Sequence, residues 1–263
     1  MIEPAAEYPP DEHLKPEVAA AYDSSFWGDK AHAETIEATV ELLAELAASA
    51  PGPDTAVEFA IGTGRIGLPL SQRGVTVHGI DFSEPMLDQL RPKPGADQIE
   101  LTVGDMTTTH VGDDFALAYL VFNTITNLRT QQLQVECFAN AAAHLRPGGH
   151  FVVEVEIPEL ASLAPGETLK PFDLRPEHVG ISEYRDRVAQ IQVSHHWFFT
   201  GDSDDRPNNS FRAVAGVFRY VWPSELDLMA QLAGMTLVDR FSDWNRAPFT
   251  GESTNGISIW RKD

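Results

Sequence analysis

The sequence predicts an α/β protein with a doubly wound parallel sheet, and two features of its central part support this expectation. Between about residues 51 and 157, short apolar runs typical of strands alternate with segments of helical periodicity. The first strand runs into the segment AVEFAIGTGRIGLPL, which spells GxGxxG at Gly62, Gly64 and Gly67. Glycines between a strand and a helix let a ligand approach the backbone and the helix N-terminus. We therefore expect a nucleotide-like ligand at the carboxyl edge of the sheet.

Residues 1–50 are expected to form an arm and a cap helix ahead of the sheet. Prolines at positions 4, 9, 10 and 16 predict an irregular arm up to about residue 29. Apolar residues then recur at helical spacing from Ile36 to Ala47, and the sequence SAPGPDT ends this pattern. The cap helix is therefore predicted to begin near Asp29 and to end at that turn.

The sheet region is predicted to comprise residues 51–157 and 223–263, which hold the alternating elements. The predicted strands are 55–61, 75–80, 99–104, 115–122 and 150–157, and the predicted helices are 65–74, 83–90 and 130–145. A further helix at 223–234 is followed by strands at 236–244 and 255–262. The connection between these last two strands is too short for a crossover helix, so we expect an antiparallel hairpin at the sheet edge.

Residues 158–222 differ from the rest because strand patterns follow one another there without helices. Three strands are predicted at 178–186, 188–200 and 211–222, and the loop sequence GDSDDRPNNS joins the last two. We expect an inserted antiparallel β lid that forms a substrate subdomain. Strand alternation places His195 on one face with the apolar side chains Ile191, Val193, Trp197 and Phe199. We expect this apolar face to cover the ligand.

The charge of the chain restricts its partners. Its 263 residues include 19 Lys and Arg but 39 Asp and Glu, which leaves a net charge of −20 at pH 7. Such a surface repels nucleic-acid phosphates and anionic lipids. No apolar run reaches the length of a membrane span, and the acidic, proline-rich amino-terminal sequence is unlike a signal peptide. We expect a cytoplasmic protein without nucleic-acid or membrane partners, with a homodimer as one candidate assembly.

The residues around the glycine turn leave two ligand classes open and then favour one. Asp81 ends the second strand and suits a ribose diol, which nicotinamide and adenosyl cofactors share. Glu58 lies inside the first strand, where a carboxylate favours a ligand with a cationic end over a pyrophosphate. In VGDM, Asp105 can accept a hydrogen bond from an exocyclic amine while Met106 lies against a flat ring. These residues favour a positively charged cofactor that contains adenine.

From about Tyr22 to its carboxyl end, the chain resembles the class I S-adenosylmethionine-dependent methyltransferases. The motifs that carry the resemblance are VEFAIGTGRIG, VHGIDFSEPML, VGDM, VFNTITNL, HLRPGGHFVVE and the closing hairpin. The resemblance implies a Rossmann-like fold with seven strands in the order 3-2-1-4-5-7-6. It also implies S-adenosylmethionine as cofactor and methyl transfer to an O or N atom of a small molecule, with secondary metabolism as one setting. The sequence departs from the family pattern at Ala60, where glycine is more frequent, and at Asn123, where many members have Asp.

The resemblance further implies which residues bind the cofactor. Glu58 would lie near its amino group, Asp81 at the ribose, Asp105 at the adenine amine, and Phe122 and Asn123 near the sulfonium. The expected cofactor-binding residues are Tyr22, Glu58, Ala60, Gly62, Gly64, Arg65, Asp81, Phe82, Met86, Gly104, Asp105, Met106, Phe122 and Asn123. Two other functions remain open from the sequence, namely a nicotinamide-dependent oxidoreductase and a module that binds the cofactor without turnover.

Candidate catalytic residues are few, because a sulfonium leaving group leaves mainly alignment to the protein. His195 and Tyr22 are the candidates for removing a proton from a hydroxyl acceptor. Packing in the core is the alternative interpretation for both, and also for Phe82 and Met86. The single cysteine, Cys137, excludes an internal disulfide and a CxxC zinc site, and no metal site is expected.

Overall fold

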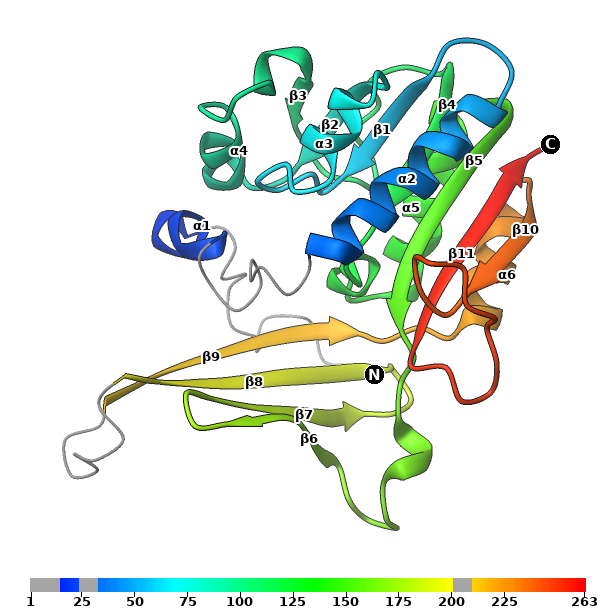
Figure 1. The fold of residues 1–263 in the computed structure, drawn as a ribbon. Helices are drawn as coiled ribbons and strands as arrows, with labels where there is room; N and C mark the ends of the chain where they lie inside the picture. Colours follow the sequence, from blue (N-terminus) through cyan, green and yellow to red (C-terminus); the bar gives the residue numbers. More distant parts are fainter. Residues whose placement is uncertain (1–14, 24–32, 201–209) are drawn as a thin grey trace.

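The computed structural model describes residues 15–23, 33–200 and 210–263. Within these ranges, seven strands form one sheet in the order β10-β11-β5-β4-β1-β2-β3, and four strands form a second sheet in the order β6-β7-β8-β9. Figure 1 shows the four-stranded sheet below the seven-stranded one, on the side toward which β5 (Leu145–Glu156) runs. The larger sheet has the predicted 3-2-1-4-5-7-6 order, because the last strand of the chain inserts between β5 and the strand before it.

The larger sheet combines five parallel strands with a carboxyl-terminal antiparallel hairpin. Besides β5, its strands are β1 (Thr55–Phe59), β2 (Thr76–Asp81), β3 (Glu100–Val103), β4 (Phe115–Leu120), β10 (Met235–Phe241) and β11 (Asn255–Lys262). Strands β1 to β5 pair in parallel, whereas β11 runs antiparallel to both β5 and β10. The carboxyl ends of β1 to β5 therefore meet at one edge, as expected for the ligand site.

Helices cover both faces of the larger sheet. The α-helices are α1 (Pro16–Tyr22), α2 (Ala33–Ser49), α3 (Gly67–Gln72), α4 (Glu84–Leu90), α5 (Gln131–His144) and α6 (Pro223–Leu232), and the 3-10 helices are η5 (Ala96–Gln98), η6 (Thr124–Asn127) and η7 (Leu160–Ser162). In β4, Leu117 and Tyr119 join the core cluster that includes α2, α3 and α4, whereas Ala118 and Leu120 join the cluster that includes α5 and α6. Apolar residues on both faces of a strand explain its continuous hydrophobic run.

Part of the segment for which an irregular arm is predicted forms the helix α1. Pro16 lies in its first turn, where the missing N–H needs no partner. Asp23, just after the helix, accepts hydrogen bonds from Thr63 Oγ1 at 2.6 Å and from Lys93 Nζ at 2.5 Å. These bonds hold α1 against the glycine turn. The rest of the arm and the predicted helix start at Asp29 lie outside the described residues.

The second sheet has four antiparallel strands where the sequence predicts three. They are β6 (Leu169–Arg175), β7 (His178–Asp186), β8 (Ile191–Thr200) and β9 (Ser210–Arg219). The additional strand, β6, contains Pro171, which argues against a strand in the middle of a sheet. It is tolerated because β6 lies at the sheet edge. Most of the predicted loop GDSDDRPNNS lies outside the described residues.

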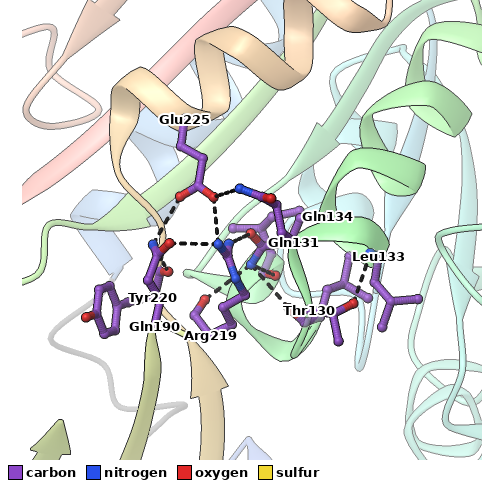
Figure 2. A network of polar contacts seen from close by, with 10 residues as sticks. Thr130, Gln131, Leu133, Gln134, Gln190, Arg219, Tyr220 and Glu225 are labelled. Carbon is purple, nitrogen blue, oxygen red and sulfur yellow. Dashed lines mark hydrogen bonds and ion pairs between the residues drawn. The ribbon is translucent and has the colours of Figure 1, made fainter. Parts of the chain in front are cut away.

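A buried polar network joins this second sheet, which we call the lid, to the larger sheet (Figure 2). Arg219, at the end of β9, donates to Gln134 Oε1 of α5 at 2.5 Å, to Gln190 Oε1 at 2.8 Å and to Glu225 Oε1 of α6 at 2.6 Å. Gln134 returns a hydrogen bond to the Arg219 carbonyl at 3.2 Å. The lid is therefore anchored at one end by charge-assisted hydrogen bonds to two helices of the larger sheet.

Candidate functional site

A cavity of about 870 Å³ opens at the carboxyl edge of the larger sheet and extends to the lid. The segments after β1, β2, β3 and β4 contribute one wall, and side chains of β7, β8 and β9 contribute another. This volume is in the range typical of small-molecule sites. Every expected cofactor-binding residue lines this cavity except Gly64.

The glycine turn after β1 uses its two central glycines for different purposes. Gly62 has φ +57° and lines the cavity, and a Cβ built on it would lie 3.3 Å from Met86 Cε. Gly64 has φ +80°, and its Cβ would lie 2.4 Å from Leu90 Cδ1 in the core. Gly62 thus exposes backbone to the cavity, whereas Gly64 lets α4 pack against the turn. Ala60 also has a positive φ, +56°, which is costly for a residue with a side chain.

Asp81 fixes the backbone on both sides of the cavity floor. Its Oδ2 accepts the Gly62 N–H at 2.7 Å, and its Oδ1 accepts the Ser83 N–H at 2.7 Å. The Asp81 carbonyl accepts the Gly104 N–H at 2.9 Å, which ties the end of β3 to the same point. The carboxylate therefore stands at the junction of three loops, where a carboxylate can accept hydrogen bonds from ligand hydroxyls.

Glu58 is a buried carboxyl group at the base of the cavity. It is only 3% exposed, and Tyr119 Oη donates a hydrogen bond to its Oε2 at 2.9 Å. Burial raises the pKa of Glu58 to about 8, although the Tyr119 hydrogen bond opposes this shift. A cationic group bound beside it would favour the ionised form.

The ends of β2 and β3 contribute a flat apolar group and a third carboxyl group. Phe82 lines the cavity with 65% of its surface exposed, which is unusual for a phenylalanine and leaves its ring free to pack on a ligand. Asp105 Oδ1 accepts hydrogen bonds from Thr107 N at 2.8 Å and Thr107 Oγ1 at 2.7 Å. Met106 lines the cavity directly after Asp105.

The backbone after β4 is strained at two successive residues. Phe122 has φ +54° and Asn123 has φ +58°, in the left-handed region that non-glycine residues rarely adopt. The Phe122 N–H donates to Glu154 Oε2 at 2.7 Å, and Thr126 Oγ1 donates to the Asn123 carbonyl at 2.6 Å. These bonds hold the strained turn, which aims Phe122 and Asn123 at the cavity.

Tyr22 and Arg65 close the cavity from the side of α1. The Arg65 guanidinium lies 3.7 Å from the Phe122 ring centroid, and its Nη2 is 3.4 Å from Tyr22 Oη. Burial raises the pKa of Tyr22 above its ordinary value of 10.0. The phenol therefore keeps its proton near neutral pH, which argues against Tyr22 as a base and favours a covering role.

His195 is not placed where the sequence analysis expects it. Its Nε2 contacts Glu183 Oε2 at 2.9 Å, and neither residue lines the cavity. The opposite face of β8, with Gln192 and Ser194, lines it instead. The apolar residues Ile191 and Val193 form a separate small core with Val217 on the His195 side. The expectation that the apolar face covers the ligand is therefore wrong, and the lid presents its polar and aromatic face.

Glu156, at the end of β5, is a cavity residue that the sequence patterns do not indicate. Its backbone N–H donates to Asn123 Oδ1 at 3.1 Å, so it lies beside the strained turn, and it lines the cavity. Burial and the neighbouring Glu154 raise the pKa of Glu156, although its side chain is accessible from the cavity. One signal was available, since a charged residue at the carboxyl end of a buried strand lies at the ligand edge.

Two features are absent from the described ranges. No helix in them is long and apolar enough to cross a membrane. They also hold no group of three or more His, Cys, Asp or Glu residues arranged to bind a metal ion.

Known proteins resemble this chain in sequence and in structure. A family model described as a methyltransferase domain matches residues 56–149. The CcbJ methyltransferase from Streptomyces caelestis is 32% identical, with a TM-score of 0.78 over 93% of this chain and 96% of that one. CalS10, an amino pentose methyltransferase from Micromonospora echinaspora solved with S-adenosylmethionine bound, is 19% identical, with a TM-score of 0.69 over 97% and 100% of the two chains. The cypemycin N-terminal methyltransferase from a Streptomyces species is 24% identical over 78% of this chain and 82% of that one.

Proposed function

This chain belongs to the class I S-adenosylmethionine-dependent methyltransferases, and we propose that it methylates an amine nitrogen of a small polar molecule. The proposal excludes the nicotinamide-dependent oxidoreductase and the binding module without turnover that the sequence left open. It assigns one part of the cavity to the cofactor and the part beneath the lid to the acceptor.

The residues around the glycine turn fit the cofactor. Gly62 has no Cβ to fill the cradle, Asp81 offers carboxylate lone pairs, and Phe82 exposes a ring. Glu58 suits an ammonium group because a bound cation would offset the effect of burial and favour the ionised carboxylate. When bound, S-adenosylmethionine supplies a methyl group on a sulfonium, which a neutral amine can attack without further activation. The protein's task is therefore to align the amine and to remove its extra proton.

Glu156 is the observation that supports an amine rather than a hydroxyl acceptor. Its backbone N–H contacts Asn123, so this cavity-lining residue lies at the part of the cavity assigned to the transferred methyl group. A carboxylate attracts an incoming ammonium group, and its raised pKa makes it a better proton acceptor than an ordinary glutamate. The curated relative named as an N-terminal methyltransferase is consistent with a nitrogen acceptor.

The lid face supports a polar acceptor. Its cavity-lining side chains combine hydroxyl and amide groups with aromatic rings: Phe172, Ser182, Tyr184, Gln192, Ser194, Phe218 and Tyr220. Hydroxyl and amide groups recognise ligand hydroxyls, and aromatic rings pack against their carbon skeleton. The net charge of −20 further favours a neutral or cationic acceptor over a polyanion.

Paired acceptors that differ only in the amine test the proposal. The purified protein is incubated with S-adenosylmethionine and one acceptor at a time. One pair of acceptors is glucosamine and methyl glucoside, and the other is trialanine and N-acetyl-trialanine. The products are identified by mass spectrometry. We expect methylation only of members that carry a free amine. Methylation of methyl glucoside at a rate equal to that of glucosamine would show that a hydroxyl is the acceptor.

Glu156→Gln tests the assigned proton acceptor. We expect kcat/KM for the methylated amine to fall about 100-fold, because the carboxamide neither attracts the ammonium nor takes its proton. Raising the pH should restore part of the rate, since more of the free amine is then neutral. The control is Glu41→Gln on the exposed surface of α2, for which we expect unchanged kinetics. A pH-independent loss in Glu156→Gln would reduce the role of Glu156 to packing.

A homodimer and a cytoplasmic location also belong to the proposal. Light scattering coupled to size-exclusion chromatography measures the assembly, and cell fractionation measures the location.

A further inference from the structure

Four lid side chains form a continuous hydrogen-bonded chain that ends at the cavity. Asp173 Oδ2 contacts His178 Nδ1 at 2.6 Å, and His178 Nε2 contacts His196 Nδ1 at 3.0 Å. His196 Nε2 contacts Ser194 Oγ at 2.9 Å. Both histidines and Ser194 are at least 90% buried, and Ser194 lines the cavity. We refer to these four residues as the Asp173–Ser194 chain.

The chemistry of Asp173 fixes the direction of every hydrogen bond in this chain. An ionised carboxylate only accepts, so His178 must carry its proton on Nδ1. When both rings are neutral, His178 Nε2 then accepts from His196 Nδ1–H. His196 Nε2 is left as an acceptor and accepts a hydrogen bond from the Ser194 hydroxyl. Ser194 Oγ therefore shows only lone pairs to the cavity.

The groups around the Asp173–Ser194 chain are consistent with an ionised Asp173 and neutral histidine rings. Arg175 of β6 donates to Asp173 Oδ2 at 2.7 Å, and together with His178 it lowers the pKa of Asp173. Burial, with the nearby His178, lowers the pKa of His196 to about 4. His195 lies on the opposite face of β8, and Arg212 of β9 lies 5.5 Å from the Phe198 ring centroid. Phe198 stacks on His178 with centroids 4.6 Å apart, which shields the chain from water.

We propose that Ser194 is an acceptor-only hydrogen-bond site, oriented by Asp173, His178 and His196, that selects a hydroxyl or N–H donor on the methyl acceptor. This inference rests on the proposed function, because it assigns the lid side of the cavity to the acceptor. A ligand group that offers only lone pairs, such as an ether or a carboxylate, would meet a second acceptor and be disfavoured. Ser194 would contact the ligand, and the other three would be positioning residues.

Protonation reverses the direction of the hydrogen bonds between His178, His196 and Ser194. A proton added to the histidine pair makes His178 Nε2 a donor to His196, and His196 Nε2 then donates to Ser194. The hydroxyl proton of Ser194 is thereby released toward the cavity. With that proton in place, the site would be a donor in place of an acceptor, with every heavy atom unmoved.

Nitrogen NMR of the histidine side chains in the full-length protein shows which ring nitrogen carries the proton, and it requires no turnover. Under mildly alkaline conditions we expect both His178 and His196 to carry their proton on Nδ1. Asp173→Ala should give mixed tautomers at both rings, and Ser194→Ala should shift only the His196 Nε2 signal strongly. Two control variants, His195→Gln on the opposite face and Ser182→Ala on the same face, should leave both tautomers unchanged. A wild-type His196 protonated on Nε2 would overturn the proposal.

Glucosamine, a probe rich in hydroxyl donors, tests the site itself. In the presence of S-adenosylhomocysteine, glucosamine binding should shift the His196 Nε2 signal, and Ser194→Ala should weaken this binding about 5-fold. Cyclohexylamine, whose only donor is the amine that the proposed function places near Glu156, should bind wild-type protein and Ser194→Ala equally. A His196 signal that ignores glucosamine would refute the site. Neither measurement requires methylation. If no amine of the acceptor panel were methylated, the proposed function would be contradicted, whereas the NMR measurements would still decide this inference.

Discussion

At the scale of single residues, Glu58 combines burial, a hydrogen bond and a ligand-facing position. Its pKa of about 8 lies above the ordinary value of 4.5 because burial disfavours the charged form. Between these two pH values the folded protein binds a proton that the unfolded chain releases. The contribution of Glu58 to the free energy of unfolding is therefore fully present below about pH 4.5, and it is lost as the pH rises toward 8.

Glu58→Gln should remove this pH dependence. The amide cannot ionise but can keep a hydrogen bond to Tyr119, so the variant should become more stable than wild type as the pH rises, by a few kcal/mol. Urea unfolding of both proteins at about pH 5 and about pH 9 measures the difference. Parallel stability curves would show that Glu58 is ionised throughout. S-adenosylmethionine affinity should fall in the same variant, since its ammonium loses a carboxylate partner.

At the scale of elements, the β1–α3 turn separates a binding glycine from a packing glycine. Gly62→Ala should weaken S-adenosylmethionine binding at least 10-fold and cost only about 1 kcal/mol of stability, which is the strain of its positive φ. Gly64→Ala should cost about 3 kcal/mol or more, because its Cβ would lie 2.4 Å from Leu90 Cδ1. Calorimetric titration and chemical denaturation give the two quantities.

Gly74→Ala is the matched control for these variants. Gly74 also has a positive φ, +92°, but a Cβ there would meet no atom within 4 Å. It should show the strain cost alone and bind the cofactor normally. Normal binding by Gly62→Ala would show that this position is only a structural turn.

The anchoring network is the second element-scale feature, because it fixes the lid to α5 and α6. Arg219→Met should lower the unfolding free energy by about 3 kcal/mol or more, since Glu225 would lose its cation and Gln134 Oε1 would lose its donor. Arg91→Met is the control, because the Arg91 pairs with Glu84 and Asp88 are solvent-exposed and should contribute less than about 1 kcal/mol. Equal losses in thermal denaturation would contradict the anchoring role.

At the scale of the whole molecule, the cofactor should stabilise the fold by binding only its native state. S-adenosylhomocysteine at about 100 times its Kd adds about 2.7 kcal/mol, which is roughly 5–10 °C in Tm for a chain of this size. NADH should leave Tm unchanged. Differential scanning fluorimetry measures both shifts, and an equal shift with NADH would contradict the specificity assigned to Glu58 and Asp105.

Much of the fold could be predicted because it depends on local patterns. Short strand-like runs that alternate with helical segments indicated β1 to β5, and the short closing connection indicated the β10–β11 hairpin. The missed strand β6 shows the limit, since Pro171 signals a strand break unless the strand is known to lie at an edge. Most of the cavity lining was predictable for the same reason, because parallel strands bring their carboxyl ends to one edge.

The sequence by itself determined the strand alternation, the glycine turn and the carboxylates at the strand ends, because these follow from local periodicity and backbone freedom. Only the tertiary structure decided which face of the lid meets the cavity, because alternation separates His195 from Ser194 but not inside from outside. It also placed Glu156 beside Asn123, and His178 against His196, across strands that pair through the fold. Such contacts join residues distant in sequence, so no local pattern determines them.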